Sequence, residues 1–101
     1  MSESMWCAAI RHSNKEEWAL AWNMTRSSNL DDSSNKKILK AMCCTTDPIN
    51  VKRLLTRVLH PTVKQHPKET SLILNQLIKN SFAREIALRF IISNWAFLNK
   101  Q

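Results

Sequence analysis

The chain has 101 residues, no glycine, and 15 basic against 8 acidic side chains, which give it a formal net charge of +7. Because phosphate loops and dinucleotide-binding motifs depend on glycine, this composition excludes both kinds of nucleotide site. A hydrophobic content of 44% predicts a folded chain, and no apolar run is long enough to span a membrane as a helix. Residues 1–9 lack the pattern of a signal peptide, so we expect any targeting element to lie outside this chain.

Two amphipathic helices are predicted at the start of the chain. The first covers about residues 2–11 and is expected to bury Met5, Trp6, Ala9 and Ile10. For the second, Asn14 is a favourable N-cap and Glu17 completes a capping-box pattern with it. This helix is expected to extend to about residue 26, with an inner face made of Trp18, Ala21, Trp22 and Thr25.

Two further helices are predicted after a polar loop over residues 27–34. One covers about residues 34–44, and its inward side chains are Ile38, Leu39, Met42 and Cys43. The next begins at Asp47, a favoured N-cap, followed by Pro48 at the first helical position. Its apolar stripe is formed by Val51, Leu54, Leu55, Val58 and Leu59, and the proline at position 61 ends the helix.

Two helices are predicted in the last part of the chain, after a linker over residues 60–66. Pro67 starts the first of them, with Glu69 in its first turn and Leu72, Ile73, Leu77 and Ile78 on one face. The final helix covers about residues 82–99 and is expected to bury Ile86, Ala87, Phe90, Ile91, Trp95 and Leu98. About six helices with short connections predict an all-α fold, in which antiparallel pairs stack as an α-solenoid segment. We treat residues 1–101 as a single partial domain.

The excess of positive charge lies in the second half of the chain. Residues 1–50 contain six basic and six acidic side chains, whereas residues 51–101 contain nine basic and two acidic ones. Such a surface is suited to nucleic acid, an anionic membrane, an acidic substrate or an acidic surface of another domain. Because the basic residues are spread over several helices, solvated helix faces and an interdomain contact are the favoured interpretation.

No pattern of catalytic or metal-binding residues is present. The sequence contains no H-E-x-x-H motif, and His12, His60 and His66 fall in loops or at helix ends without a partner at metal-binding spacing. Asn23 begins an N-x-[ST] sequon and is a candidate for glycosylation, although it lies on a predicted helix. An unmodified surface asparagine is the competing interpretation.

The three cysteines leave two interpretations open. Cys43 and Cys44 are adjacent at the end of a helix, so their side chains point in different directions. Cys43 fits the apolar stripe, whereas Cys44 is available for another contact. Reduced, buried thiols are the default interpretation. A bridge from Cys7 to Cys44 is the alternative, and it implies an oxidising compartment.

Several short motifs together resemble one protein family. In chain order they are Trp6–His12, Glu16–Trp18, Ala41–Pro48, Arg53–Leu55 with His60–Pro61, Asn80 with Ala83–Ala87, and Phe90–Trp95. Each motif is short, but their ordered combination resembles the C-terminal helical domain of zinc aminopeptidases of the aminopeptidase N type. The resemblance covers nearly the whole chain. The chain departs from the family where Ser13 and Ala83 replace a usual glycine, and where Leu88 replaces a usual tryptophan.

The resemblance implies a noncatalytic module of an aminopeptidase that removes N-terminal residues from peptides. In that family the helical domain closes over a separate catalytic domain, which holds the zinc and its ligands. We therefore expect no cofactor in this chain, no activity of the chain alone, and two partners: the catalytic domain of the parent and the peptide substrate. The family also implies a disulfide between Cys7 and Cys44 and an extracellular or cell-surface location within the parent protein.

Three arginines are candidate contacts for the substrate. Arg53, Arg57 and Arg84 lie in the basic half of the chain and have the chemistry to bind a peptide's C-terminal carboxylate. Solvation at the surface is the favoured alternative for each of them. The alternative function is a basic helical-repeat adaptor that binds a partner protein or nucleic acid, with a steep dependence on salt. The family resemblance instead predicts no binding to nucleic acid.

Overall fold

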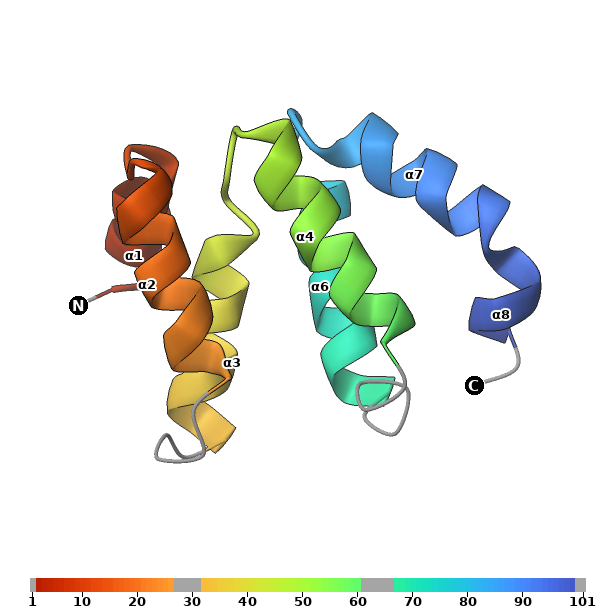
Figure 1. The fold of residues 1–101 in the computed structure, drawn as a ribbon, viewed down its shortest axis with the longest axis horizontal. Coiled ribbons are helices and arrows are strands. Elements are labelled where there is room, and N and C mark those ends of the chain that lie inside the picture. Colours follow the sequence, from red (N-terminus) through yellow and green to blue (C-terminus); the bar gives the residue numbers. More distant parts are fainter. Residues whose placement is uncertain (1, 27–31, 61–66, 100–101) are drawn as a thin grey trace. The chain divides into compact units, whose positions relative to one another are not determined.

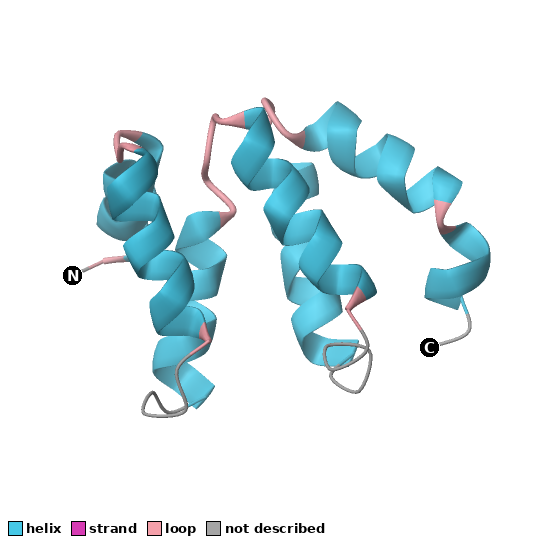
Figure 2. Cartoon of the chain, in the orientation of Figure 1, coloured by secondary structure: helices cyan, strands magenta, loops and turns pink. Residues whose placement is uncertain are grey.

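The computed structural model describes residues 2–26, 32–60 and 67–99, and within them the chain forms helices and loops without a strand (Figures 1 and 2). The helices are α1 (Glu3–Arg11), α2 (Lys15–Thr25), α3 (Asp32–Met42), α4 (Pro48–Leu59), α6 (Pro67–Lys79), α7 (Arg84–Ser93) and α8 (Trp95–Asn99). The all-α prediction is confirmed. The chain divides into two compact units, one ending at Thr45 and the other starting at Thr46. The treatment of the chain as one domain and the solenoid stacking of its helices stay predictions.

In the first unit, α3 packs against both α1 and α2. The buried apolar side chains are Ile10, Trp18, Ile38, Leu39, Ala41, Met42 and Cys43. The predicted capping box is confirmed, because the Glu17 amide donates to Asn14 Oδ1 at 2.8 Å and the Asn14 amide donates to Glu17 Oε1 at 2.9 Å. Thr25 is also buried as predicted, and Trp18 stacks on Trp22 with 5.3 Å between the ring centroids.

The predicted inner face of α1 is wrong for three of its four residues. Met5 is 57% exposed, and Trp6 and Ala9 are also exposed, whereas Ile10 is buried. The contacts of α1 lie along another face: Glu3 pairs with Lys40 of α3, Cys7 is bonded to Cys44 after α3, and the buried Ile10 is on the same side of the helix. Apolar periodicity identifies an apolar face, but it does not show which neighbouring helix covers that face.

Helix α3 starts and ends about two residues earlier than predicted, at Asp32 and Met42. Its end is closed by i to i−3 hydrogen bonds, in which the Cys44 amide donates to the Ala41 carbonyl at 2.9 Å. The predicted loop over residues 27–34 overlaps this helix at 32–34, and residues 27–31 lie outside the described residues. The linker at 60–66 also lies outside them, except for His60 at the end of α4.

In the second unit, α4, α6 and α7 pack on one another, and α7 is followed by α8. Asp47 caps α4 as predicted, since its Oδ1 accepts from the Ile49 amide at 2.9 Å. The core contains Val51, Leu54, Leu55, Val58, Ile73, Leu77, Ala83 and Ala87. The buried polar residues Asn50 and Thr70 carried no signal in the sequence.

The long final helix predicted over residues 82–99 is divided in the structure. Asn80 Oδ1 accepts from the Phe82 amide at 3.0 Å, and this local turn delays the start of α7 to Arg84. Asn94 separates α7 from α8, and its Nδ2 donates to the Phe90 carbonyl at 2.9 Å. The prediction that Trp95 is buried in the core is wrong, because its side chain is 59% exposed.

Candidate functional site

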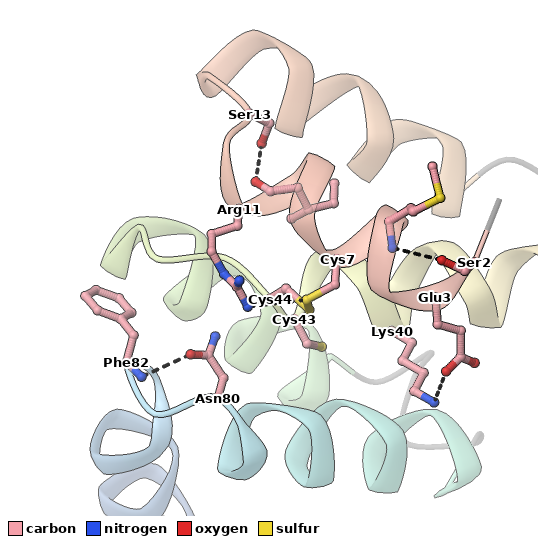
Figure 3. Close-up of a disulfide and its surroundings, with 12 residues drawn as sticks. Ser2, Glu3, Cys7, Arg11, Ser13, Lys40, Cys43, Cys44, Asn80 and Phe82 are labelled. Carbon is pink, nitrogen blue, oxygen red and sulfur yellow. Dashed lines mark hydrogen bonds and ion pairs between the residues drawn. A yellow bond between two sulfur atoms is a disulfide. The ribbon is translucent and has the colours of Figure 1, made fainter.

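A disulfide joins Cys7 in the middle of α1 to Cys44 directly after α3 (Figure 3). The two Cα atoms lie 5.4 Å apart, and the bridge spans a sequence separation of 37 residues. Closing a loop of this length stabilises the folded state by about 3–4 kcal/mol, through the entropy that the unfolded chain loses. The bridge therefore contributes much of the stability with which α1 is held beside α3.

The surroundings of the two sulfur atoms differ. Arg11 lies one helical turn after Cys7, and its Nη2 donates to Cys7 Sγ at 3.6 Å. Beside Cys44, the thiol of Cys43 is buried in the core, and its Sγ donates to the Leu39 carbonyl at 3.4 Å. Cys7 and Cys44 are themselves only partly buried. The two bridged cysteines are thus partly exposed residues, while the third cysteine is buried.

The three candidate arginines lie in different local environments of the second unit. Arg53 is an exposed residue of α4. Arg57 is half-buried and forms an ion pair with Glu69 of α6, so its charge is already compensated. Arg84 is exposed, and its Nε donates to the Ile78 carbonyl at 2.7 Å, which ties the start of α7 to the last turn of α6.

The candidate glycosylation residue Asn23 is exposed on α2. Thr25, the third residue of its sequon, is buried, and its Oγ1 donates to the Trp22 carbonyl at 2.7 Å. In the folded chain the sequon is therefore part of a regular helix, with Asn23 and Met24 exposed and Thr25 buried.

No cluster of metal ligands is formed by the residues that the structure describes. Among residues 2–26, 32–60 and 67–99, no three His, Cys, Asp or Glu side chains lie together as ligands for a metal ion. His12 and His60 are exposed at helix ends, and His66 lies outside these ranges. Within the same ranges, no helix has the length and apolarity to cross a bilayer.

Sequence reasoning named the Cys7–Cys44 pair but not the other contacts of the candidate residues. The spacing of Cys7 and Arg11 by four residues is a usable signal, because it places both on one side of a helix. The pairing of Arg57 with Glu69 has no such signal, since it depends on how α4 and α6 pack. The contact of Arg84 with a backbone carbonyl is likewise set by the turn between α6 and α7.

The whole chain, residues 1–101, matches the model of a family described as "ERAP1-like C-terminal domain". Aminopeptidase N of Bos taurus is 30% identical over 95 residues, which cover 94% of this chain and 10% of that protein. The aminopeptidase N proteins of Mus musculus and Homo sapiens are 27% and 26% identical, with the same shares covered. The chain thus spans about a tenth of the length of these curated relatives. No solved structure matches the chain.

Proposed function

Because the chain belongs to the ERAP1-like C-terminal domain family, we propose that it is a noncatalytic helical module of a zinc aminopeptidase. In this role it helps to enclose the substrate peptide and to hold the catalytic domain in its closed form. The observation that carries the proposal is the match of the whole chain to that family, with relatives that are named aminopeptidase N. In this proposal, zinc and the catalytic residues belong to a separate catalytic domain of the parent protein. That domain is the partner of this chain.

We take Arg53 as the candidate to test for contact with the substrate. It is exposed on α4, in the basic second half of the chain, whereas Arg57 is half-buried beside Glu69. An exposed guanidinium binds a carboxylate through charge-assisted hydrogen bonds. We assign Arg53 to the C-terminal carboxylate of the peptide and regard Arg57 as a structural residue.

The proposed location is extracellular or at the cell surface, as part of a secreted or membrane-anchored parent. The Cys7–Cys44 disulfide supports this, because such bonds persist in oxidising compartments and are rare in the cytosol.

A chimeric enzyme tests the proposed function. In Bos taurus aminopeptidase N, the segment that matches this chain is replaced by residues 1–101, and hydrolysis of an aminoacyl reporter and of a short peptide is measured. We expect the chimera to be active and a chimera that carries Leu54→Asp to lose activity, because Leu54 is fully buried. Equal activity of a folded enzyme that lacks the segment altogether would contradict the proposal.

The role of Arg53 is tested in the same chimera. Arg53→Ala is expected to raise KM for a peptide with a free C-terminal carboxylate by about two- to tenfold. It should leave KM for the C-terminally amidated peptide unchanged, since that peptide has no carboxylate to bind. Arg89→Ala is the matched control, because Arg89 is an exposed arginine of the same unit. A similar rise for both peptides would remove the proposed role.

The alternative, a basic adaptor for nucleic acid, makes a different prediction. An adaptor binds RNA or DNA with an affinity that falls steeply between about 50 and 200 mM salt. The aminopeptidase module is expected to show no such binding at either salt concentration, and filter binding of the isolated chain separates the two functions.

A further inference from the structure

We propose that the Cys7–Cys44 disulfide is a site of thiol–disulfide exchange, where a dithiol reduces the bond and thereby releases α1 from α3. This inference is independent of the proposed aminopeptidase function. It rests on three features of the first unit: a cation at one sulfur, partial exposure of both cysteines, and the small apolar contact that α1 makes.

The cation gives the exchange a direction. Arg11 Nη2 lies 3.6 Å from Cys7 Sγ, and Figure 3 shows the guanidinium beside the disulfide. In thiol–disulfide exchange the departing sulfur carries negative charge, which a neighbouring guanidinium stabilises. Cys7 is therefore the better leaving group, and Cys44 Sγ is the atom that an incoming thiolate attacks.

The reaction has two balanced steps. A thiolate of the dithiol attacks Cys44 Sγ, the bond between the two cysteine sulfurs breaks, and Cys7 departs as a thiolate that is then protonated. The second thiolate of the dithiol then attacks the first sulfur of the same dithiol, which is bonded to Cys44 in the mixed disulfide, and Cys44 leaves as a thiolate that is protonated. Two electrons pass from the dithiol, which becomes a cyclic or intramolecular disulfide, to the two cysteines, which become thiols. Cys43 stays outside the reaction because it is buried and bonded to the Leu39 carbonyl.

Helix α1 is the element that responds to cleavage. Ile10 is its only buried residue among those described, and Met5 and Trp6 are exposed. The ion pair of Glu3 with Lys40 of α3, at 3.1 Å, is exposed and therefore contributes little. Without the covalent bond, α1 has little buried apolar surface of its own to hold it in place. Reduction thus converts a fixed helix into one that detaches easily.

The direction of attack is tested on the oxidised full chain with a monothiol, reduced glutathione. The reaction is stopped with acid, remaining thiols are alkylated, and the position of glutathione is mapped by mass spectrometry. We expect the adduct mainly on Cys44 and the alkyl group on Cys7. An adduct mainly on Cys7 would overturn the proposal.

The role of Arg11 is tested by the rate of reduction with dithiothreitol. Arg11→Met is expected to slow reduction by about two- to fivefold, the range for a partly screened charge, and Arg11→Lys is expected to restore most of the rate. Lys15→Met is the matched control, because it removes an exposed charge elsewhere in the first unit. Salt at 0.5 M screens the charge of Arg11 and should therefore slow reduction of the wild-type chain. This measurement does not depend on whether the variants fold. Equal rates for wild type and Arg11→Met, or no effect of salt, would contradict the role of Arg11.

The release of α1 is tested by hydrogen exchange of the oxidised and reduced chains. Amides of residues 3–11 are expected to exchange faster by on the order of tenfold after reduction, while amides of α4 and α6 change little. A Cys7→Ser, Cys44→Ser variant should match the reduced chain, which separates loss of the bond from effects of the reductant. Unchanged protection of α1 after complete reduction would show that the disulfide does not control this helix.

Discussion

The guanidinium of Arg57 on α4 pairs with the carboxylate of Glu69 in the first turn of α6, and these two helices pack against each other. The two side chains are only 14% and 21% exposed. Water therefore screens this pair less than a surface ion pair, and removing one partner leaves the other charge poorly solvated. The pair joins two helices that are separated in the sequence by the linker at 60–66.

Loss of this ion pair is expected to destabilise the chain. Arg57→Met should lower the free energy of unfolding by about 1–2 kcal/mol, a value between those of surface and buried pairs. The pair Glu85 and Arg89 provides the control, because its side chains are 76% and 79% exposed. Urea unfolding should show a change below about 0.5 kcal/mol for Arg89→Met. A double-mutant cycle with Glu69→Gln then isolates the interaction energy of the pair. An interaction energy close to zero would contradict the predicted contribution of the pair.

Removal of the disulfide is expected to cost more than removal of any ion pair. The Cys7→Ser, Cys44→Ser double variant should lose about 3–4 kcal/mol of stability in urea unfolding at equilibrium, because its unfolded chain is no longer closed into a loop. Cys43→Ala tests a cysteine outside the bridge and should cost less, since it removes only one buried sulfur atom. Equal losses for the two variants would contradict the predicted contribution of loop closure.

Ala83 is expected to be sensitive to size although it lies in a turn. It is fully buried, and its backbone has φ −89° and ψ −14°, so it does not need the conformational freedom of glycine. Ala83→Leu should destabilise the chain by about 1–3 kcal/mol through overpacking. The neighbouring Ser81 is exposed, and Ser81→Leu should be nearly neutral. Thermal unfolding of both variants measures the difference.

The capping box of α2 makes a further prediction. Asn14→Ala removes the acceptor for the Glu17 amide and should lower stability by about 1 kcal/mol. Glu16→Gln changes a residue of the same helical turn without touching the box, and it should have a smaller effect. Far-ultraviolet circular dichroism during urea unfolding follows both variants.

Local signals in the sequence were sufficient for the starts of α2 and α4. Asn14 and Asp47 were identified as N-caps because capping depends on residues only two or three positions away. The break at Asn94 was missed, since its side chain competes with the helix for a carbonyl within an otherwise apolar pattern. The exposure of Met5 was missed because periodicity does not specify the neighbour that covers a face.

The candidate site could be predicted only in part. From the residues alone, the pairing of Cys7 with Cys44 was one of two alternatives, because a cysteine carries no local signal of its partner. The family resemblance favoured the bridge that the structure contains. The contacts of Arg57 and Arg84 depend on the packing of α4, α6 and α7, so they were not accessible from spacing.

The described turns contain no residue with positive φ, and the chain has no glycine. Asn80 instead shapes its turn through an accepted hydrogen bond, with ordinary backbone angles at Ala83. Each residue that replaces a glycine reduces the conformational entropy of the unfolded ensemble, which stabilises the native state by about 0.4–1 kcal/mol where the backbone geometry allows it. A small helical chain thus gains part of its stability from the restricted freedom of its denatured state.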